Sequence, residues 1–336
     1  MSLYSRREAL KLGLFSSSAV GLLAAGAPLL KAAEPAPAAP TAKPNSRVNG
    51  VHIGLNVPYS FRNNSMDADG VLAGCVQLGV SGVEIRSQPI EAAMGLPAGF
   101  LPAGRGGRGG QGQNAAAPTG LPPEQRAIEL SRWRVNADLD KARALRRKYE
   151  EAGVFIEILK FDNIYTQSDE VTDYFFELAR AVGAHAISCE MQVADTKRLG
   201  AFADRHRIPV GYHNHTQKPG EWESAFGHAK FNGANVDIGH YIANNDTSVV
   251  DFLKKYPDRV THLHIKDRKR GTLANDGANV VFGEGDTPIV DVLRLIRDNR
   301  WQIQATIEYE YPLPPGSDPM KELAKSIDFC RRALAS

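Results

Sequence analysis

The chain has little cysteine, and the cysteines it has form no recognisable framework. Its 336 residues include three, Cys75, Cys189 and Cys330, which are widely spaced and odd in number. This pattern contains neither a disulfide framework nor a CxxC zinc site. We therefore expect each thiol to be a small, buried, apolar group.

The chain also lacks a surplus of charge. Its formal net charge is +2, and residues 1–33 hold four basic residues against the single acid Glu8, a surplus of three. The remaining residues therefore carry about −1. This balance leaves no strongly basic surface to hold nucleic acid.

The N-terminus has the pattern of an export signal. Arg6 and Arg7 precede a short run of apolar and small residues over 12–30. A run this short behind a basic front is typical of a signal peptide rather than of a membrane span. The arginine pair resembles a twin-arginine signal, which directs folded proteins across the bacterial inner membrane. We therefore expect a signal peptide over residues 1–33 and a periplasmic mature protein with no stable membrane span, the alternatives being a Sec signal or a retained anchor.

The amino-acid composition divides the rest of the chain into a linker, a folded domain and an insertion within that domain. Residues 34–50 are rich in proline and alanine and are expected to form a linker, so that the folded domain covers residues 51–336. Residues 99–123 include a Gly/Arg-rich stretch that cannot bury enough apolar surface to order itself. We expect a disordered insertion there.

Short β-rich runs alternate with longer helical stretches, which indicates βα units around a parallel sheet. Helices are predicted over 137–151, 170–182 and 291–299. The predicted strands span residues 52–57, 82–86, 154–161, 186–191, 209–215, 235–241, 261–267 and 304–311. Eight units are the number that closes a single (β/α)8 TIM barrel.

Catalytic groups in such barrels lie at the C-terminal ends of the strands. The ionisable residues that fall there are Glu84, Arg86, Glu157, Lys160, Glu190, His213, His215, Asp237, His240, His262, His264, Glu308 and Glu310. Alternate residues of a strand point the same way, so neighbouring strands can direct their carboxylates and imidazoles at one centre. Burying so many ionisable groups without partners is unfavourable, which favours a shared divalent cation or a charge network.

The residue types restrict the candidate metals but do not identify one. Carboxylate and imidazole without thiolate suit Mn²⁺, Mg²⁺, Co²⁺ or Zn²⁺. We expect one such ion. Taken alone, a strand histidine such as His264 is more often a structural residue, and only the repetition over neighbouring strands supports a metal site.

Several motifs together resemble one family. Val236-Asp237-Ile238-Gly239-His240, His262-Leu263-His264-Ile265-Lys266-Asp267 and Ile307-Glu308-Tyr309-Glu310, with Gly211-Tyr212-His213-Asn214-His215 upstream, are similar to motifs of the sugar phosphate isomerase/epimerase family of xylose isomerase-like TIM barrels. The resemblance covers roughly residues 51–333. It is specific for fold and metal site and much less so for substrate.

The resemblance implies roles for individual residues. Asp237, His264 and Glu308 would be metal ligands, with Glu308 doubling as acid/base, and His240 would contact the substrate. Ketose 3-epimerases of this superfamily place a glutamate where this chain has His213. If His213 is a ligand, Glu190 is the residue that can restore the missing carboxylate, as a ligand or as a second catalytic group.

Further residues are expected at the pocket. Tyr59 and Phe61 follow the first strand and can line it with aromatic surface, although most such rings prove to be packing residues. Asp267 and Arg268 fall where the family often places polar substrate contacts. Lys160 and His215 complete the expected substrate-binding set, and His215 and His262 are also candidates to orient metal ligands.

The resemblance implies chemistry on a carbohydrate. The leading prediction is a metal-dependent isomerase or epimerase of a sugar or keto-sugar that acts through an enediolate stabilised by the cation. The alternative is a lyase or dehydratase that eliminates a β-substituent from a 3-keto-glycoside or inosose. Two other classes are weaker candidates: phosphodiester hydrolysis by a multi-zinc cluster, and a sugar-binding barrel without activity. The sequence does not reveal the substrate or the oligomeric state.

Overall fold

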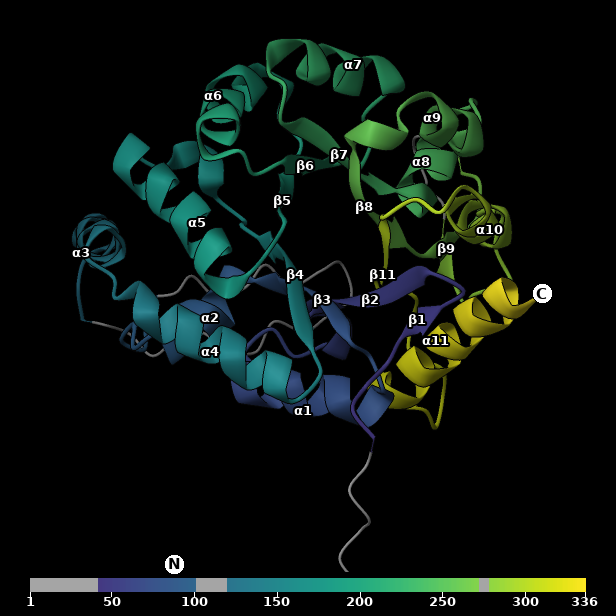
Figure 1. Ribbon diagram of the computed structural model, residues 1–336, viewed down its shortest axis with the longest axis horizontal. Coiled ribbons are helices and arrows are strands. Elements are labelled where there is room, and N and C mark those ends of the chain that lie inside the picture. The colour runs from purple at the N-terminus through teal and green to yellow at the C-terminus, as the bar shows by residue number, and fades with distance from the viewer. Residues whose placement is uncertain (1–41, 101–119, 272–277) are drawn as a thin grey trace, which may run out of the picture. The chain divides into compact units, whose positions relative to one another are not determined.

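The computed structural model describes residues 42–100, 120–271 and 278–336. In this part of the chain, eight parallel strands close into a barrel with helices on its outside (Figure 1). The strands follow one another around the barrel in chain order, and the last, β11, pairs with the first, β2. The predicted (β/α)8 barrel is confirmed.

Each barrel strand overlaps one of the predicted runs. The strands are Val51–Val57 (β2), Gly82–Arg86 (β3), Phe155–Lys160 (β4), Ala186–Glu190 (β5), Val210–His213 (β6), Asn232–Asp237 (β7), Val260–Ile265 (β8) and Gln304–Ile307 (β11). Three two-residue strands lie outside the barrel: Arg47–Val48 (β1), Asp267–Arg268 (β9) and Asn279–Val280 (β10). Because β1 pairs antiparallel with the start of β2, the ordered chain begins before the expected boundary at residue 51. The predicted signal peptide, most of the predicted linker and most of the 99–123 insertion lie outside the described residues.

The helices connect the strands on the outside of the barrel. They are Ala68–Leu78 (α1), Ser87–Ala93 (α2), Pro123–Val135 (α3), Leu139–Glu151 (α4), Asp169–Val182 (α5), Thr196–His206 (α6), Pro219–His228 (α7), Ile238–Asn244 (α8), Val249–Lys255 (α9), Ile289–Asn299 (α10) and Pro319–Ala335 (α11). Short 3₁₀ turns cover Tyr59–Phe61 (η1), Ile164–Thr166 (η2), Val193–Asp195 (η3) and Pro257–Arg259 (η4). None of the helices in the described ranges is long and apolar enough to cross a membrane.

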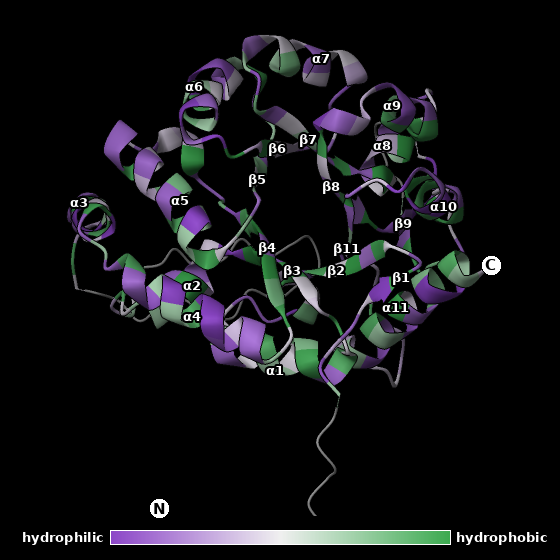
Figure 2. Cartoon of the chain, in the orientation of Figure 1, coloured by the Kyte–Doolittle hydropathy of each residue, from purple (hydrophilic) through white to green (hydrophobic). Residues whose placement is uncertain are grey.

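Helix α5 shows why the sequence predicted these elements well. The Ser168 hydroxyl accepts a hydrogen bond from the Val171 amide and caps the first turn. The helix stops at Gly183, whose φ of +85° is left-handed and suits glycine. Hydrophobic and hydrophilic residues alternate along the helices, as Figure 2 shows. Their apolar sides pack on the barrel; the rings of Phe161 and Phe175, for example, lie 4.1 Å apart between centroids.

The sixth predicted strand, 235–241, is wrong at its C-terminal end. Strand β7 stops at Asp237, and helix α8 begins at the next residue. The Asp237 carboxylate accepts a hydrogen bond from the His240 amide at 2.7 Å and so caps the new helix. His240 therefore lies on a helix and not on a strand. The predicted strands 209–215 and 304–311 also end early, so His215 and Glu310 lie in the loops that follow.

All three cysteines are buried free thiols, as the sequence predicted. Burial raises the pKa of each thiol to about 12. Since the thiolate is the reactive form, we expect the native protein to react with a thiol reagent such as DTNB far more slowly than the urea-unfolded protein, which should release three equivalents of chromophore. Rapid labelling of the native protein would contradict the buried positions.

Candidate metal centre

The C-terminal end of the barrel interior is lined with charged side chains. Glu84 on β3 contacts His264 on β8, although two other strands, β2 and β11, separate β3 from β8 in the sheet. Such a contact is possible only if both side chains point into the barrel. Both are fully buried. The interior at this end is therefore a charge network, in place of the branched apolar layers usual in such barrels.

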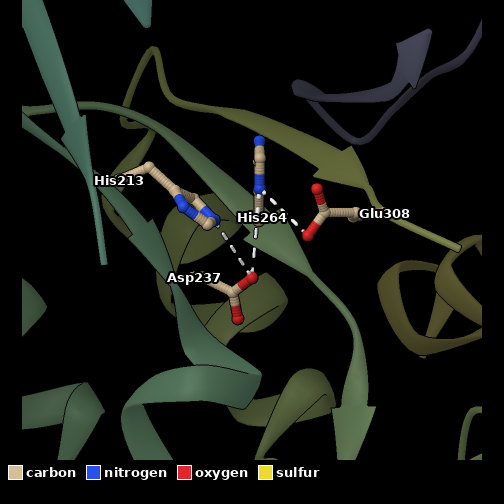
Figure 3. Close-up of side chains that lie close together, drawn as sticks. All are labelled: His213, Asp237, His264 and Glu308. Carbon is tan, nitrogen blue, oxygen red and sulfur yellow. Dashed lines mark hydrogen bonds and ion pairs between the residues drawn. The ribbon is translucent and has the colours of Figure 1, made fainter. Parts of the chain in front are cut away.

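Four side chains at the C-terminal ends of four neighbouring strands converge at the mouth of the barrel (Figure 3). His213 Nε2 lies 3.4 Å from Asp237 Oδ2. His264 Nδ1 lies 3.4 Å from Glu308 Oε2 and 3.9 Å from Asp237 Oδ2. One nitrogen or oxygen from each of the four lies within 4.8 Å of all the others, which is the spacing of ligands around a single cation.

Two features show that this quartet, His213, Asp237, His264 and Glu308, fits a divalent cation. His264 Nδ1 is buried and has no hydrogen-bond partner among the described residues, so its position suits a metal ligand. The second feature is that a cation already lies among the carboxylates. Lys266 Nζ is 2.8 Å from Asp237 Oδ2 and 2.6 Å from Glu308 Oε2.

Lys266 also reaches a third carboxylate, Glu310, at 2.6 Å. Burial lowers the pKa of Lys266, but the three negative charges outweigh it and raise the pKa well above its usual range. In the same way, burial raises the pKa of Glu308, whereas Lys266 and His264 lower it well below its ordinary value. Both groups are therefore charged at neutral pH, and the mouth of the barrel strongly favours positive charge beside these carboxylates.

The quartet contains His213 and not Glu190. The Glu190 carboxylate lies behind the imidazole, with Oε2 2.9 Å from His213 Nδ1. The same oxygen is 2.9 Å from the half-exposed His215, and the other oxygen is 3.0 Å from the buried Lys160. Glu190 thus holds His213 with its Nε2 facing Asp237, as carboxylates do behind metal-bound histidines.

Glu84 stands in the same relation to His264. It contacts His264 Nε2, the ring nitrogen on the side away from Glu308. His262 Nε2 lies 3.5 Å from the same carboxylate oxygen. Burial lowers the pKa of His262 to about 4, so this second imidazole is neutral. The pKa of His264 is lowered by burial but raised more strongly by Glu84 and Glu308, to about 10.

We expect Glu84→Gln to weaken binding of Mn²⁺ by about 10- to 100-fold, because the amide no longer fixes the ring of His264. Calorimetric titration of the metal-free protein measures this directly. The matched control is Glu129→Gln on the exposed side of α3, which should bind Mn²⁺ as the wild type does. Equal affinities for the two variants would mean that Glu84 does not orient His264.

The remaining predicted residues divide into two groups. His240 and Arg268 lie beside the quartet, and Lys160 and Tyr59 contact its neighbours Glu190 and Glu310. His240 Nε2 is 3.9 Å from Asp237 Oδ2, and its Nδ1 contacts the buried guanidinium of Arg268. The Tyr59 hydroxyl donates to Glu310 at 2.6 Å.

Two predicted substrate-binding residues make structural contacts. The Asp267 carboxylate accepts hydrogen bonds from the backbone amides of Gly283, Gly285 and Thr287, at 2.8 to 3.2 Å, and so holds the loop after β10. Phe61 packs into the core, where its ring would lie 2.8 Å from a Cβ placed on Gly74 of α1. Neither residue is brought to the quartet.

The sequence interpretation gave no role to Lys266 or Asn56. Asn56 lies on β2, and its amide donates to Glu308 Oε1 at 2.7 Å. Lys266 is two residues after His264, and the period of two along a strand was the available signal. This periodicity places Lys266 on the same face as His264, but a lysine is not expected beside a metal site.

Comparisons with known proteins agree with this fold. A family described as Xylose isomerase-like TIM barrel matches residues 175–333. An inosose dehydratase of Clostridium perfringens is 26% identical over an alignment of 153 residues, and the match covers 40% of this chain and 51% of that protein. The chain thus matches about half the length of this curated relative.

Solved structures resemble nearly the whole barrel. A xylose isomerase domain protein from Alicyclobacillus acidocaldarius is 15% identical with a TM-score of 0.57, covering 85% of this chain and 100% of that one. D-psicose 3-epimerase from Clostridium cellulolyticum, solved with D-tagatose, is 11% identical with a TM-score of 0.57, covering 84% and 99%. At these identities the likeness establishes the fold, a xylose isomerase-like barrel.

Proposed function

We propose that this chain, a xylose isomerase-like barrel with a metal-ligand quartet at its mouth, is a divalent-metal-dependent isomerase or epimerase of a sugar or keto-sugar. We further propose that it belongs to the sugar phosphate isomerase/epimerase family. The observation that supports the function is the convergence of His213, Asp237, His264 and Glu308 from four successive strands. A divalent cation bound there supplies positive charge beside the oxygens of a carbonyl substrate.

Glu308 is the group best placed to move the proton. Its two oxygens are held by Asn56 at 2.7 Å and by Lys266 at 2.6 Å, so the carboxylate has one orientation. Its lowered pKa keeps it ionised and able to accept a proton from the carbon next to the carbonyl. The Lys266 ammonium is positioned to stabilise negative charge that develops on the substrate oxygen.

A second candidate is β-elimination by a lyase or dehydratase, and the position of Glu190 favours it. Epimerisation by two bases needs a second free carboxylate on the opposite face of the sugar. Glu190 instead lies behind the ring of His213, on its Nδ1 side, where it also pairs with Lys160 and His215. Elimination needs one base to remove the proton and one acid to protonate the leaving group, so it does not require a second free carboxylate. The partial similarity to an inosose dehydratase agrees with this route.

We also propose that the substrate is a free or glycosidic sugar that the enzyme meets in the periplasm. The proposal rests on the twin-arginine pattern at Arg6 and Arg7 and on the absence of a P-loop pattern from the sequence. The export step is tested by fusing residues 1–41 to a reporter protein that must cross the inner membrane in its folded state. The double variant Arg6→Lys/Arg7→Lys is the control.

Proton exchange tests the function and separates its two forms. The Mn²⁺-loaded protein is incubated in D₂O with D-fructose, D-tagatose and a 3-keto-glucoside, and the products are followed by NMR. Deuterium at the carbon next to the carbonyl with a new epimer or aldose supports the isomerase. An unsaturated product with loss of the aglycone or of water supports the lyase. Absence of exchange with every substrate would overturn both.

A further inference from the structure

A cavity opens at the other end of the barrel, where the strands begin. Its volume is about 400 Å³, and it is lined by His52 near the start of β2 and by Gln304 at the start of β11. The proposed metal centre lies at the opposite ends of these strands, near Asn56 in β2 and Glu308 just after β11. Asn56 is four positions after His52, and Glu308 is four positions after Gln304, which corresponds to about 13 Å at about 3.3 Å per residue.

The charges that line this cavity are balanced. Arg47 lies 3.4 Å from Glu157, and Arg146 lies 2.6 Å from Glu150. His52 Nδ1 is 2.8 Å from the same Glu157 oxygen. Two arginines and two glutamates pair with each other, so the cavity has hydrogen-bond donors and acceptors but no excess of positive or negative charge. A neutral polar ligand fits this lining better than an anion or a cation.

Aromatic rings stand among these polar groups. Phe155 begins β4, yet 46% of its surface is exposed, and it lines the cavity together with the partly exposed Trp301. Exposed rings beside hydrogen-bonding groups provide a flat apolar surface for a ligand that has both C–H faces and hydroxyl edges. Sugars have both.

The cavity also contains an unpaired buried donor. Gln304 is 2% exposed, and its Nε2 has no hydrogen-bond partner among the described residues. Leaving such a donor unpaired is unfavourable. A Cβ on Gly54 or on Gly82 would lie 2.4 Å from this nitrogen, so the two glycines make the space that the amide occupies.

We propose that this cavity is a second, non-catalytic binding site for a neutral carbohydrate of one or two rings. Its volume lies within the range of about 300–1,000 Å³ that small-molecule sites have. The proposal stands apart from the proposed function, because none of these lining residues contacts the quartet. It assigns the two ends of the barrel to different tasks, chemistry at one and retention of a saccharide at the other.

Cellobiose is the probe, and its binding to the Mn²⁺-loaded protein is measured by calorimetry and by saturation-transfer NMR. We expect Phe155→Ala to weaken binding about two- to tenfold, with kcat on any turned-over substrate unchanged. Because Phe155 is exposed, its replacement leaves the core intact. Ile128→Ala, which removes another exposed apolar side chain outside the cavity, should bind cellobiose as the wild type does.

Two further results decide the location and the ligand class. Glu308→Gln should bind cellobiose normally, and glucose 6-phosphate should bind more weakly than cellobiose because no positive charge is in excess. Loss of cellobiose binding in Glu308→Gln would place the sugar at the barrel mouth and overturn the proposal. Failure of cellobiose to bind the wild type, or equal binding by wild type and Phe155→Ala, would overturn it too, whatever the outcome of the exchange experiment.

Discussion

Replacing Glu308 with glutamine is expected to lower kcat by about 10²- to 10⁴-fold, the usual contribution of a positioned acid or base. The amide keeps the shape of the side chain and its contact with Asn56, but it accepts no proton and gives the metal one charge less. Lys266 retains Asp237 and Glu310 as partners, so the fold should persist. Rates are measured on the substrate identified by deuterium exchange.

Metal content separates the two roles of Glu308. Glu308→Gln with normal Mn²⁺ and a lost rate would identify a base, whereas loss of both would identify a ligand. His264→Ala should lose the metal in either case. The matched control is Glu177→Gln, which changes an exposed carboxylate paired with Arg180 on α5 and should keep both metal and rate. Wild-type rates in both Glu308→Gln and His264→Ala would exclude the proposed centre.

Glu91→Ala is expected to destabilise the protein by about 3–5 kcal/mol, because it leaves a buried arginine without its partner. The Arg134 guanidinium, on α3, donates to both oxygens of Glu91, on α2, at 2.8 and 3.1 Å. Glu91 is fully buried and Arg134 nearly so. The pair joins the two helices that flank residues 101–119, so its loss should loosen both.

The midpoint and slope of urea unfolding measure this effect. Glu129→Ala, which breaks the exposed pair with Arg132 on the same helix α3, serves as the control and should change stability by less than about 0.5 kcal/mol. Similar midpoints for Glu91→Ala and Glu129→Ala would show that the buried pair contributes little.

The elements were predictable because their signals are local. Ser168 caps α5 and Gly183 ends it, and both act within a few residues of chain. The eight β-rich runs were recognised by residue type alone. The error at residues 238–241 has a local cause as well, since Asp237 is at once a strand-end residue and a helix cap. From the sequence alone, a carboxylate in that position is compatible with a continuing strand and with the start of a helix.

The choice between Glu190 and His213 as a candidate metal ligand could not be made from local sequence. The sequence placed both at strand ends, and either residue type can bind a divalent metal. Only the packed barrel showed that the Glu190 carboxylate lies between Lys160 and two histidines, behind the imidazole of His213. The same holds for Glu84, whose partner is 180 residues away in the chain.

The sequence by itself determined the barrel, the face on which each strand residue lies, and the residue types that gather at the mouth. Periodicity and capping are properties of short segments, so they can be read without coordinates. Tertiary structure alone decided which side chains converge at the mouth, that Lys266 lies among their carboxylates, and that Asp267 and Phe61 make structural contacts. Those outcomes depend on distances between strands that are far apart in the chain, and closure of the barrel sets those distances.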